Sequence, residues 1–298
     1  MFAKRTDLAL EAKELWQESA ADLTRLSGVR AKRTRLEGYP VTRVDILDRQ
    51  GAESLGKPEG SYRTVDLTDY CLRRQDFFPR AVRAVGAQLK ELLPEEGSVL
   101  VVCLGNEAMT PDAVGPLTAK NVLITRHLIS SLPQQFAGLR PVSALCTGVL
   151  GTTGLEAVET VRGVTGRIRP AAVIAVDALA ARRCQRVCST IQISDTGIIP
   201  GSGVGNHRVA LNRETLGVPV FAVGVPTVVD GATLAADLLE ESGIRVFDPG
   251  KLRTGKGNLM VTPQDIDARV RDLAKVIGYG INWALQALDI EEISALLG

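Results

Sequence analysis

The sequence has few of the residues from which metal sites and disulfide frameworks are built. Its 298 residues include 2 histidines and 5 cysteines. The odd number and irregular spacing of the cysteines argue against a disulfide framework. Neither histidine stands in a zinc-binding pattern, and a tetrahedral site needs four well-spaced ligands. We therefore expect buried thiols and no cysteine-ligated metal site.

Long apolar runs and a net charge are missing too. No apolar run has membrane-spanning length, and the amino terminus lacks the apolar segment of a secretory signal. Lys and Arg number 35 against 34 Asp and Glu, which gives a formal net charge of +1. So small a charge would not draw the chain to nucleic acid or to a membrane surface. We expect a protein that stays in the compartment where it is made and binds neither.

The chain alternates between strand and helix patterns. Apolar, β-branched runs typical of buried strands recur at 98–104, 141–146, 171–176, 189–193 and 219–224. Between them, apolar periodicity predicts helices over 111–129 and 154–164, and a long amphipathic helix follows Pro263. This alternation predicts an α/β protein with a largely parallel central sheet flanked by helices.

The first hundred residues look like additions to that sheet. Alternating residues at 41–47 and 61–67 predict two paired strands, and a helical pattern covers 79–93. We expect one domain over 8–298. Within it, residues 28–97 would form a peripheral hairpin and helix, and residues 98–298 the core sheet and its helices.

Two aspartates stand where buried strands are predicted to end. Asp112 follows the 98–104 strand in a Thr-Pro-Asp helix start, and Asp177 directly follows the 171–176 strand. Ligands and chemistry in open α/β sheets gather at this edge. A close carboxylate pair shares one proton, so one group can activate water while the other protonates the substrate. We expect the helix dipole to keep Asp112 ionised and Asp177 to carry the proton. A helix-start residue and a turn residue are the plainer alternatives.

Three glycine-rich stretches suggest anion binding. Residues 250–257 fit the phosphate-loop pattern until Gly257 replaces the required Ser or Thr, and residues 201–205 follow a proline rather than a strand. Both departures argue against a nucleotide site. The turn over 148–154 could offer backbone N–H groups to an oxyanion. A non-catalytic α/β module that binds an anionic ligand therefore stays open as an alternative function.

Several long motifs, in order along nearly the whole chain, resemble the germination protease family of endospore-forming bacteria. They are Thr110–Pro116, Asp177–Arg182, Thr190–Gly197, Pro200–Asn206 and Gly224–Asp230. The resemblance implies an endopeptidase that initiates degradation of small acid-soluble spore proteins during germination, in the cytoplasm of the forespore and spore core. It also implies an atypical aspartic peptidase with catalytic residues Asp112 and Asp177, no cofactor and a homotetramer.

The family's fold is similar to that of the hydrogenase-maturation peptidases, which sense a metal. A metal-dependent maturation-type peptidase is therefore another alternative, although the shortage of His and paired Cys speaks against it.

The resemblance further implies a zymogen that cuts itself. The family's cleavage site is similar to Thr6-Asp7-Leu8-Ala9, so the expected cut lies between Asp7 and Leu8 and releases residues 1–7 as a short leader. Arg182 and Arg183, a few residues beyond Asp177, are candidates to bind the acidic residue of a substrate because guanidinium pairs well with carboxylate. A solvated helix face is the alternative for this pair.

Overall fold

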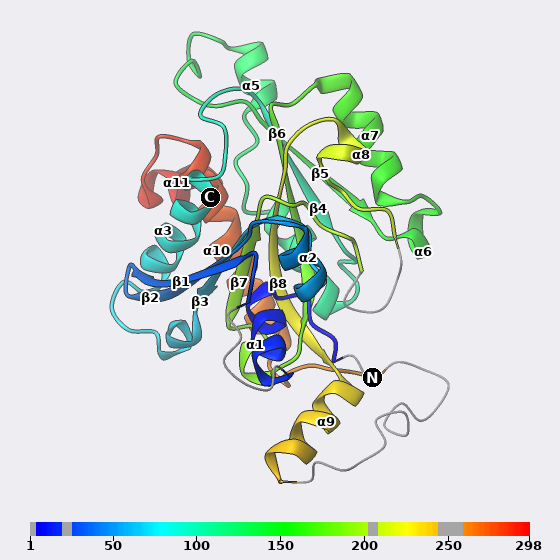
Figure 1. Cartoon of the computed structure of the whole chain (residues 1–298). Coiled ribbons are helices and arrows are strands. Elements are labelled where there is room, and N and C mark those ends of the chain that lie inside the picture. The colour runs from blue at the N-terminus through cyan, green and yellow to red at the C-terminus, as the bar shows by residue number, and fades with distance from the viewer. Residues whose placement is uncertain (1–3, 20–25, 202–207, 244–258) are drawn as a thin grey trace.

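The computed structural model describes residues 4–19, 26–201, 208–243 and 259–298. In these residues one sheet runs in the strand order β1-β2-β3-β7-β8-β6-β4-β5, with β9 beside β8 (Figure 1). The strands are β1 (Val29–Leu36), β2 (Tyr39–Ile46), β3 (Gly60–Asp66), β4 (Val99–Leu104), β5 (Val142–Gly148), β6 (Ala172–Ala181), β7 (Thr190–Ser194), β8 (Val220–Asp230) and β9 (Met260–Val261).

Helices cover both faces of this sheet, with α3, α10 and α11 on one side and α6, α7 and α8 on the other (Figure 1). The α-helices are α1 (Ala9–Ser19), α2 (Arg49–Leu55), α3 (Phe77–Lys90), α4 (Val114–Ala119), α5 (Arg126–Ser131), α6 (Leu150–Thr153), α7 (Ala157–Ile168), α8 (Arg213–Leu216), α9 (Gly231–Glu241), α10 (Ile266–Leu285) and α11 (Ile290–Leu297). The described residues also form the short 3₁₀ turns η1 (Thr68–Leu72), η2 (Thr110–Asp112) and η3 (Cys184–Arg186). Within the described part of the chain, no helix combines the length and the apolarity needed to cross a membrane.

The strands at the centre confirm the predicted α/β class. Strands β5, β4, β6 and β8 pair in parallel. Strand β7 runs antiparallel to β8 and continues the sheet into β3, β2 and β1, which are antiparallel too. The predicted hairpin is therefore part of the main sheet. Strand β1 was not predicted, because this edge strand is exposed along most of its length and carries no apolar alternation.

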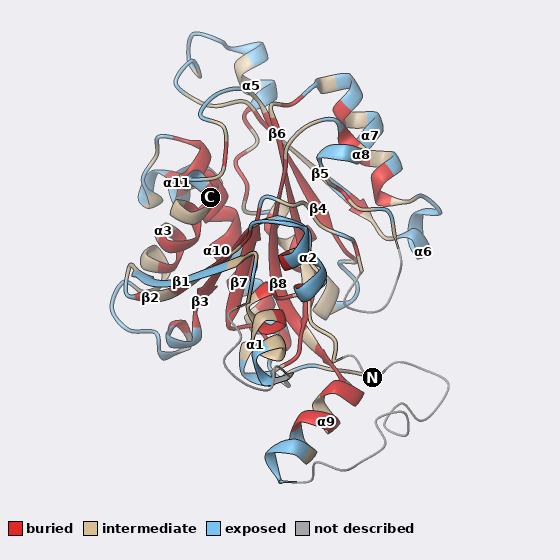
Figure 2. Cartoon of the chain, in the orientation of Figure 1, coloured by how far each residue is buried: buried red, intermediate tan, exposed pale blue. Residues whose placement is uncertain are grey.

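The core lies on both faces of the parallel strands, which Figure 2 shows as the most deeply buried part of the molecule. All six residues of β4 are buried, which explains its unbroken apolar run. Val101 and Cys103 pack with residues of α3, α4 and α10, whereas Leu100 and Val102 pack with residues of α7. The two-residue period of the strand thus supplies both halves of the core.

Three predicted boundaries were wrong. The helix expected over 111–129 is divided into η2, α4 and α5. Between α4 and α5, the Thr125 hydroxyl donates to the carbonyl of Arg140 and accepts the N–H of Val142. These bonds hold the chain against the start of β5 and interrupt the helix there. Strands β6 and β8 pair with each other well beyond their predicted ends at 176 and 224. As a result Asp177 lies inside β6 rather than after it.

Candidate active site

A cavity of about 250 Å³ opens at the carboxyl ends of β4 and β6. Its walls include Leu104 and Gly105 from the end of β4, Asp112 from η2, and Asp177 from β6. The sequence predicts that the two aspartates meet at this edge of the sheet, and the structure places both in the lining of one cavity. The surrounding walls are mostly apolar, and they include Thr227 of β8.

Asp112 is held over the end of β4 by backbone geometry that only glycine permits. Gly105 has φ +110°, and a Cβ there would lie 2.0 Å from the carbonyl oxygen of Asp112. The backbone N–H of Asn106 donates to Oδ2 of Asp112 at 2.8 Å. The η2 turn is anchored to β8 as well, since Thr227 Oγ1 donates to the carbonyl of Pro111 at 2.7 Å.

Asp177 is almost inaccessible to solvent, with an exposed fraction of 4%. Its carboxylate accepts the backbone N–H of Ala178 at 2.9 Å and a backbone N–H from Gly201. Burial raises the pKa of Asp177 well above its ordinary value, and the nearby charge of Asp112 raises it further. Of the two carboxyl groups, Asp177 is therefore the one whose protonated form is favoured more strongly.

The pKa of Asp112 is also raised by burial, but two interactions oppose the rise. These are the hydrogen bond from Asn106 and the positive charge of Arg208. Both pKa values are thus raised, and that of Asp177 is raised more strongly. Asp112 ends a 3₁₀ turn two residues before α4 begins at Val114, so the contribution of the helix dipole stays a prediction.

A protonated carboxyl beside a more acidic one is a general acid–base device. In its ionised form Asp112 can accept a proton from water, and in its protonated form Asp177 can donate one to a substrate atom. The apolar walls and the buried position strengthen both effects because they lower the local dielectric.

The turn over 148–154 contributes Gly148 and Val149 to the cavity wall. Its candidate N–H donors are largely used within the turn. Thr152 and Thr153 donate to the carbonyl of Val149, and Gly154 donates to that of Leu150. This reduces its capacity to bind an oxyanion. Most of the glycine-rich stretch over 201–205, and the whole of that over 250–257, lie outside the described residues.

The predicted cleavage site is folded against β6 and β7. The N–H of Asp7 donates to the carbonyl of Ala180 at 2.9 Å, and the N–H of Ala180 donates to the Asp7 carboxylate at 2.8 Å. Gln192 Nε2 donates to the carbonyl of Asp7 at 3.2 Å, and its Oε1 accepts the N–H of Ala9 at 2.8 Å. Leu8 is fully buried. The carbonyl of the Asp7–Leu8 peptide is thus held by a hydrogen bond from Gln192.

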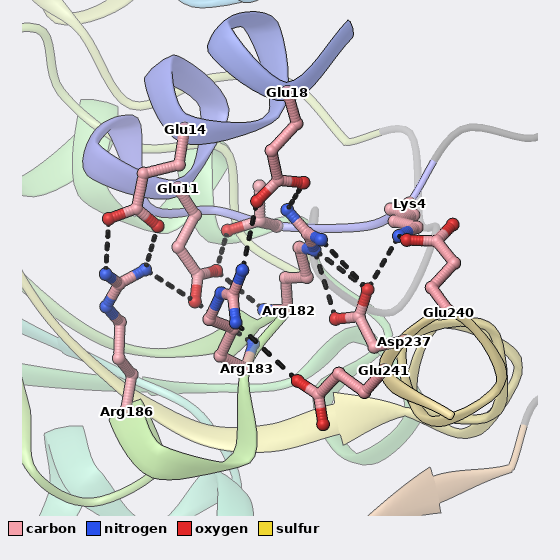
Figure 3. A network of polar contacts seen from close by, with 11 residues as sticks. Lys4, Glu11, Glu14, Glu18, Arg182, Arg183, Arg186, Asp237, Glu240 and Glu241 are labelled. Carbon is pink, nitrogen blue, oxygen red and sulfur yellow. Dashed lines mark hydrogen bonds and ion pairs between the residues drawn. The ribbon is translucent and has the colours of Figure 1, made fainter. Parts of the chain in front are cut away.

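Arg182 and Arg183 do not line the cavity in this structure; they bind carboxylates of the chain itself (Figure 3). Arg182, 3% exposed, pairs with Glu18 at 2.8 Å and with Asp237 at 3.0 Å. Arg183 pairs with Glu18 at 3.0 Å. The geometry therefore gives both guanidinium groups a structural role, because these carboxylates already occupy them. The alternative of a solvated face fails for Arg182, since it is buried.

Glu11 completes this cluster and has no exposed surface. Its carboxylate accepts the backbone N–H groups of Arg182 at 2.6 Å and Arg183 at 3.1 Å, and it pairs with Arg186 at 3.1 Å. We call Glu11, Glu18, Arg182, Arg183, Arg186 and Asp237 the carboxylate–arginine clamp. It joins α1 and α9 to the segment that follows β6 (Figure 3).

One charged residue of the cavity, Arg208, was not predicted from the sequence. Arg208 is the only basic residue among those that line it in the described part of the chain. No motif marked it, because it stands alone after a glycine-rich stretch. The expectation of buried thiols was right for Cys103 and Cys188 and wrong for Cys146 and Cys184, which are exposed. The described residues include no cluster of three or more His, Cys, Asp or Glu that could hold a metal ion.

Comparison with known proteins gives one consistent family. The family model described as "Germination protease" matches residues 9–241. The germination protease of Caldanaerobacter subterraneus subsp. tengcongensis is 43% identical over 98% of both chains. That of Clostridium perfringens (strain ATCC 13124) is 41% identical over 100% of both. That of Bacillus cytotoxicus is 39% identical over 95% of this chain and 94% of its own.

Among solved structures, the [NiFe] hydrogenase maturation protease HycI from Thermococcus kodakarensis KOD1 is 17% identical. The match covers 65% of this chain and 99% of that one, with a TM-score of 0.37. A score this low carries no argument about fold or function.

Proposed function

This chain belongs to the germination protease family, and from that premise we propose that it is an endopeptidase of the atypical aspartic type that initiates degradation of small acid-soluble spore proteins during germination. One observation carries the chemical part of the proposal. Two carboxyl groups, Asp112 of η2 and Asp177 of β6, line one cavity, and burial raises the pKa of Asp177 more strongly than that of Asp112. Such a pair is the acid–base device that peptide hydrolysis needs.

In the proposed reaction Asp112 acts as the base and Asp177 as the acid. Asp112 accepts a proton from a water molecule as its oxygen attacks the carbonyl carbon of the peptide. Asp177 donates its proton to the substrate, so that the peptide nitrogen can leave as an amine. Arg208 favours the ionised form of Asp112, because its positive charge lowers the pKa of that carboxyl. No step requires a cofactor.

We further propose that the chain is made as a zymogen and that a cut between Asp7 and Leu8 releases the leader. The contacts of the leader support an anchored starting state. Lys4 pairs with Asp237 at 2.7 Å, and the N–H of Arg5 donates to Thr233 Oγ1 at 3.2 Å. Leu8 is buried and the Asp7 carbonyl accepts a hydrogen bond from Gln192. The segment around this peptide bond must therefore detach from β6 before the aspartate pair of the cavity can cut it.

The organisation of the protein in the cell is also a proposal. We propose one peptidase domain over 8–298, assembled as a homotetramer in the spore core. The continuity of the N-terminal hairpin with the central sheet supports the single domain. Family membership alone supports the tetramer and the location.

The experiment uses a peptide that spans residues 4–16. It is incubated with the full-length protein and with the variants Asp112→Asn and Asp177→Asn, each with and without chelator, and the products are weighed by mass spectrometry. We expect cleavage after Asp7 by the parent, unaffected by chelator, and a loss of about 100- to 10,000-fold in each variant. Cleavage that survives a substitution would remove that aspartate from the mechanism.

Loss of activity on chelation, restored by one metal, would favour the metal-dependent alternative. If the peptide stays intact, a small acid-soluble spore protein is the next substrate. Failure on both, together with a ligand-induced rise in melting temperature, would favour the anion-binding module.

A further inference from the structure

Two cysteines that the proposed reaction does not use lie side by side in the sheet. Cys103 of β4 and Cys146 of β5 are register partners, so their side chains project from the same face. Neighbouring strands lie about 4.8 Å apart. This separation falls within the range of about 4.4–6.8 Å between Cα atoms that a disulfide requires. The two thiols are close enough for each to shift the pKa of the other.

The two thiols differ in access and in acidity. Cys103 is fully buried in the core cluster that includes α4, whereas Cys146 is exposed. The interaction with the Cys103 thiol lowers the pKa of Cys146 to about 7, and the same interaction raises the pKa of Cys103. Near neutral pH, Cys146 therefore has substantial thiolate character, and the thiolate is the nucleophilic form of cysteine.

We propose that Cys103 and Cys146 form a dithiol that a hydroperoxide oxidises to a disulfide, with Cys146 as the attacking thiol and Cys103 as the resolving thiol. In the first step the Cys146 sulfur takes one oxygen atom from hydrogen peroxide and becomes a sulfenic acid, while the second oxygen leaves as water. In the next step the Cys103 sulfur attacks that sulfenic sulfur, the S–S bond forms, and a second water leaves. The peroxide is reduced and the two thiols are oxidised.

The local backbone can accommodate the bond. Among the described strands, β5 is at the edge of the sheet and has a neighbouring strand, β4, on one side only. The pairing of β4 with β5 shifts by one residue directly after the cysteines, where Leu104 pairs with Gly148 and Thr147 is the extra residue. An edge strand next to such an irregularity can move by the fraction of an ångström that disulfide closure needs.

The position of the pair connects it to the cavity. Leu104 directly follows Cys103, Gly148 stands two residues after Cys146, and both line the cavity with the aspartates. A disulfide here would fix the distance between two strands that form one wall of the site.

The test uses the full-length parent and the variants Cys146→Ser, Cys103→Ser and Cys184→Ser. Each is treated with equimolar hydrogen peroxide at neutral pH, alkylated in denaturant and mapped by peptide mass spectrometry. Cys184 is the matched control, because it is exposed too, whereas burial and the charges of Asp237 and Glu241 raise its pKa. Circular dichroism checks that each variant is folded.

In the parent and in Cys184→Ser we expect a linked peptide pair, Cys103 with Cys146, that has lost two hydrogen atoms and is restored by dithiothreitol. Cys103→Ser should stop at a sulfenic acid on Cys146, which dimedone traps. Cys146→Ser should leave Cys103 unmodified.

Three outcomes would overturn the proposal. In the first, both thiols of the parent stay fully alkylatable while Cys184 is oxidised. In the second, the linked pair contains a different cysteine. In the third, no sulfenic acid forms on Cys146 in a folded Cys103→Ser protein. If Cys103→Ser does not fold, the comparison of the parent with Cys146→Ser decides.

Discussion

Buried carboxylates lie in two settings near β6. At the cavity, Asp112 and Asp177 have no ion-pair partner within the described residues. A few residues further on, the clamp gives Glu11 and Asp237 arginine partners at 3.1 and 3.0 Å. Where an arginine contacts the carboxylate, its positive charge balances the negative one, and the ion pair holds α1 and α9 in place. Where no cation is in contact, burial favours the protonated carboxyl group, as at Asp177. The difference separates a structural cluster from a site suited to proton transfer.

Breaking the clamp should have the largest effect on stability. Removing one member of a buried ion pair costs about 3–5 kcal/mol. Arg182→Met should cost the lower end of this range or less, because Asp237 keeps Lys4 at 2.7 Å and the partly exposed Glu18 keeps Arg183 at 3.0 Å. Urea denaturation measures the change in the free energy of unfolding. Arg183→Met is the matched control, because its side chain is 32% exposed and its pairs should contribute less than about 1 kcal/mol. An unchanged free energy in Arg182→Met, with a raised KM, would instead indicate a substrate-binding role.

Removing the buried acid should change how stability depends on pH. Because Asp177 has a raised pKa in the folded protein, its contribution is fully present below the unfolded pKa of about 3.9 and is lost as pH rises through the folded pKa. Asp177→Asn should therefore gain stability relative to the parent as pH rises across this window. Thermal unfolding of both proteins at several pH values measures the difference. A difference that stays constant with pH would mean that the pKa of Asp177 is not raised on folding.

Arg208 tests whether a positive charge near the cavity carboxylates affects their titration, because it is the basic residue in the described lining of the cavity. Arg208→Gln removes that charge, so the pKa of Asp112 should rise and the acid limb of the kcat/KM profile should move to higher pH. Arg208→Lys keeps a positive charge and should leave the limb nearer to its original position. If the acid limb is the same in all three proteins, Arg208 does not act on the base.

The smallest effect is expected at the solvent edge of the clamp. Glu240 is 43% exposed and pairs with Lys4 at 2.6 Å, while Lys4 keeps its second partner, Asp237. Glu240→Gln should therefore change the free energy of unfolding by less than about 1 kcal/mol, and added salt should reduce that difference. A larger loss, measured by the same urea titration, would mean that the leader contributes more to the fold than its contacts indicate.

The sequence predicted the parts of this molecule that depend on local pattern. The apolar run of β4 predicted a strand buried on both faces, and the Thr-Pro-Asp motif placed Asp112 at the edge where Asp177 also lies. It did not predict that β6 continues past Asp177, because the pairing with β8 that extends the strand is not visible in a local window. Nor could it assign Arg182 to the clamp, since its partners Glu18 and Asp237 lie far away in the chain. The cause of the Asp112 pKa likewise depends on contacts across the fold.

In the proposed mechanism Asp177 holds the single proton of the pair and Asp112 is the more acidic group. Carbon-13 NMR of the aspartate carboxyl carbons, followed as pH is varied, tests it directly, with Asp112→Asn and Asp177→Asn to assign the signals. We expect that Asp177 is still protonated at a pH where Asp112 is largely ionised, and that Asp112→Asn lowers the midpoint of Asp177 because a neighbouring negative charge is gone. Two carboxyls that both titrate at ordinary aspartate values, or a proton that is on Asp112, would contradict it.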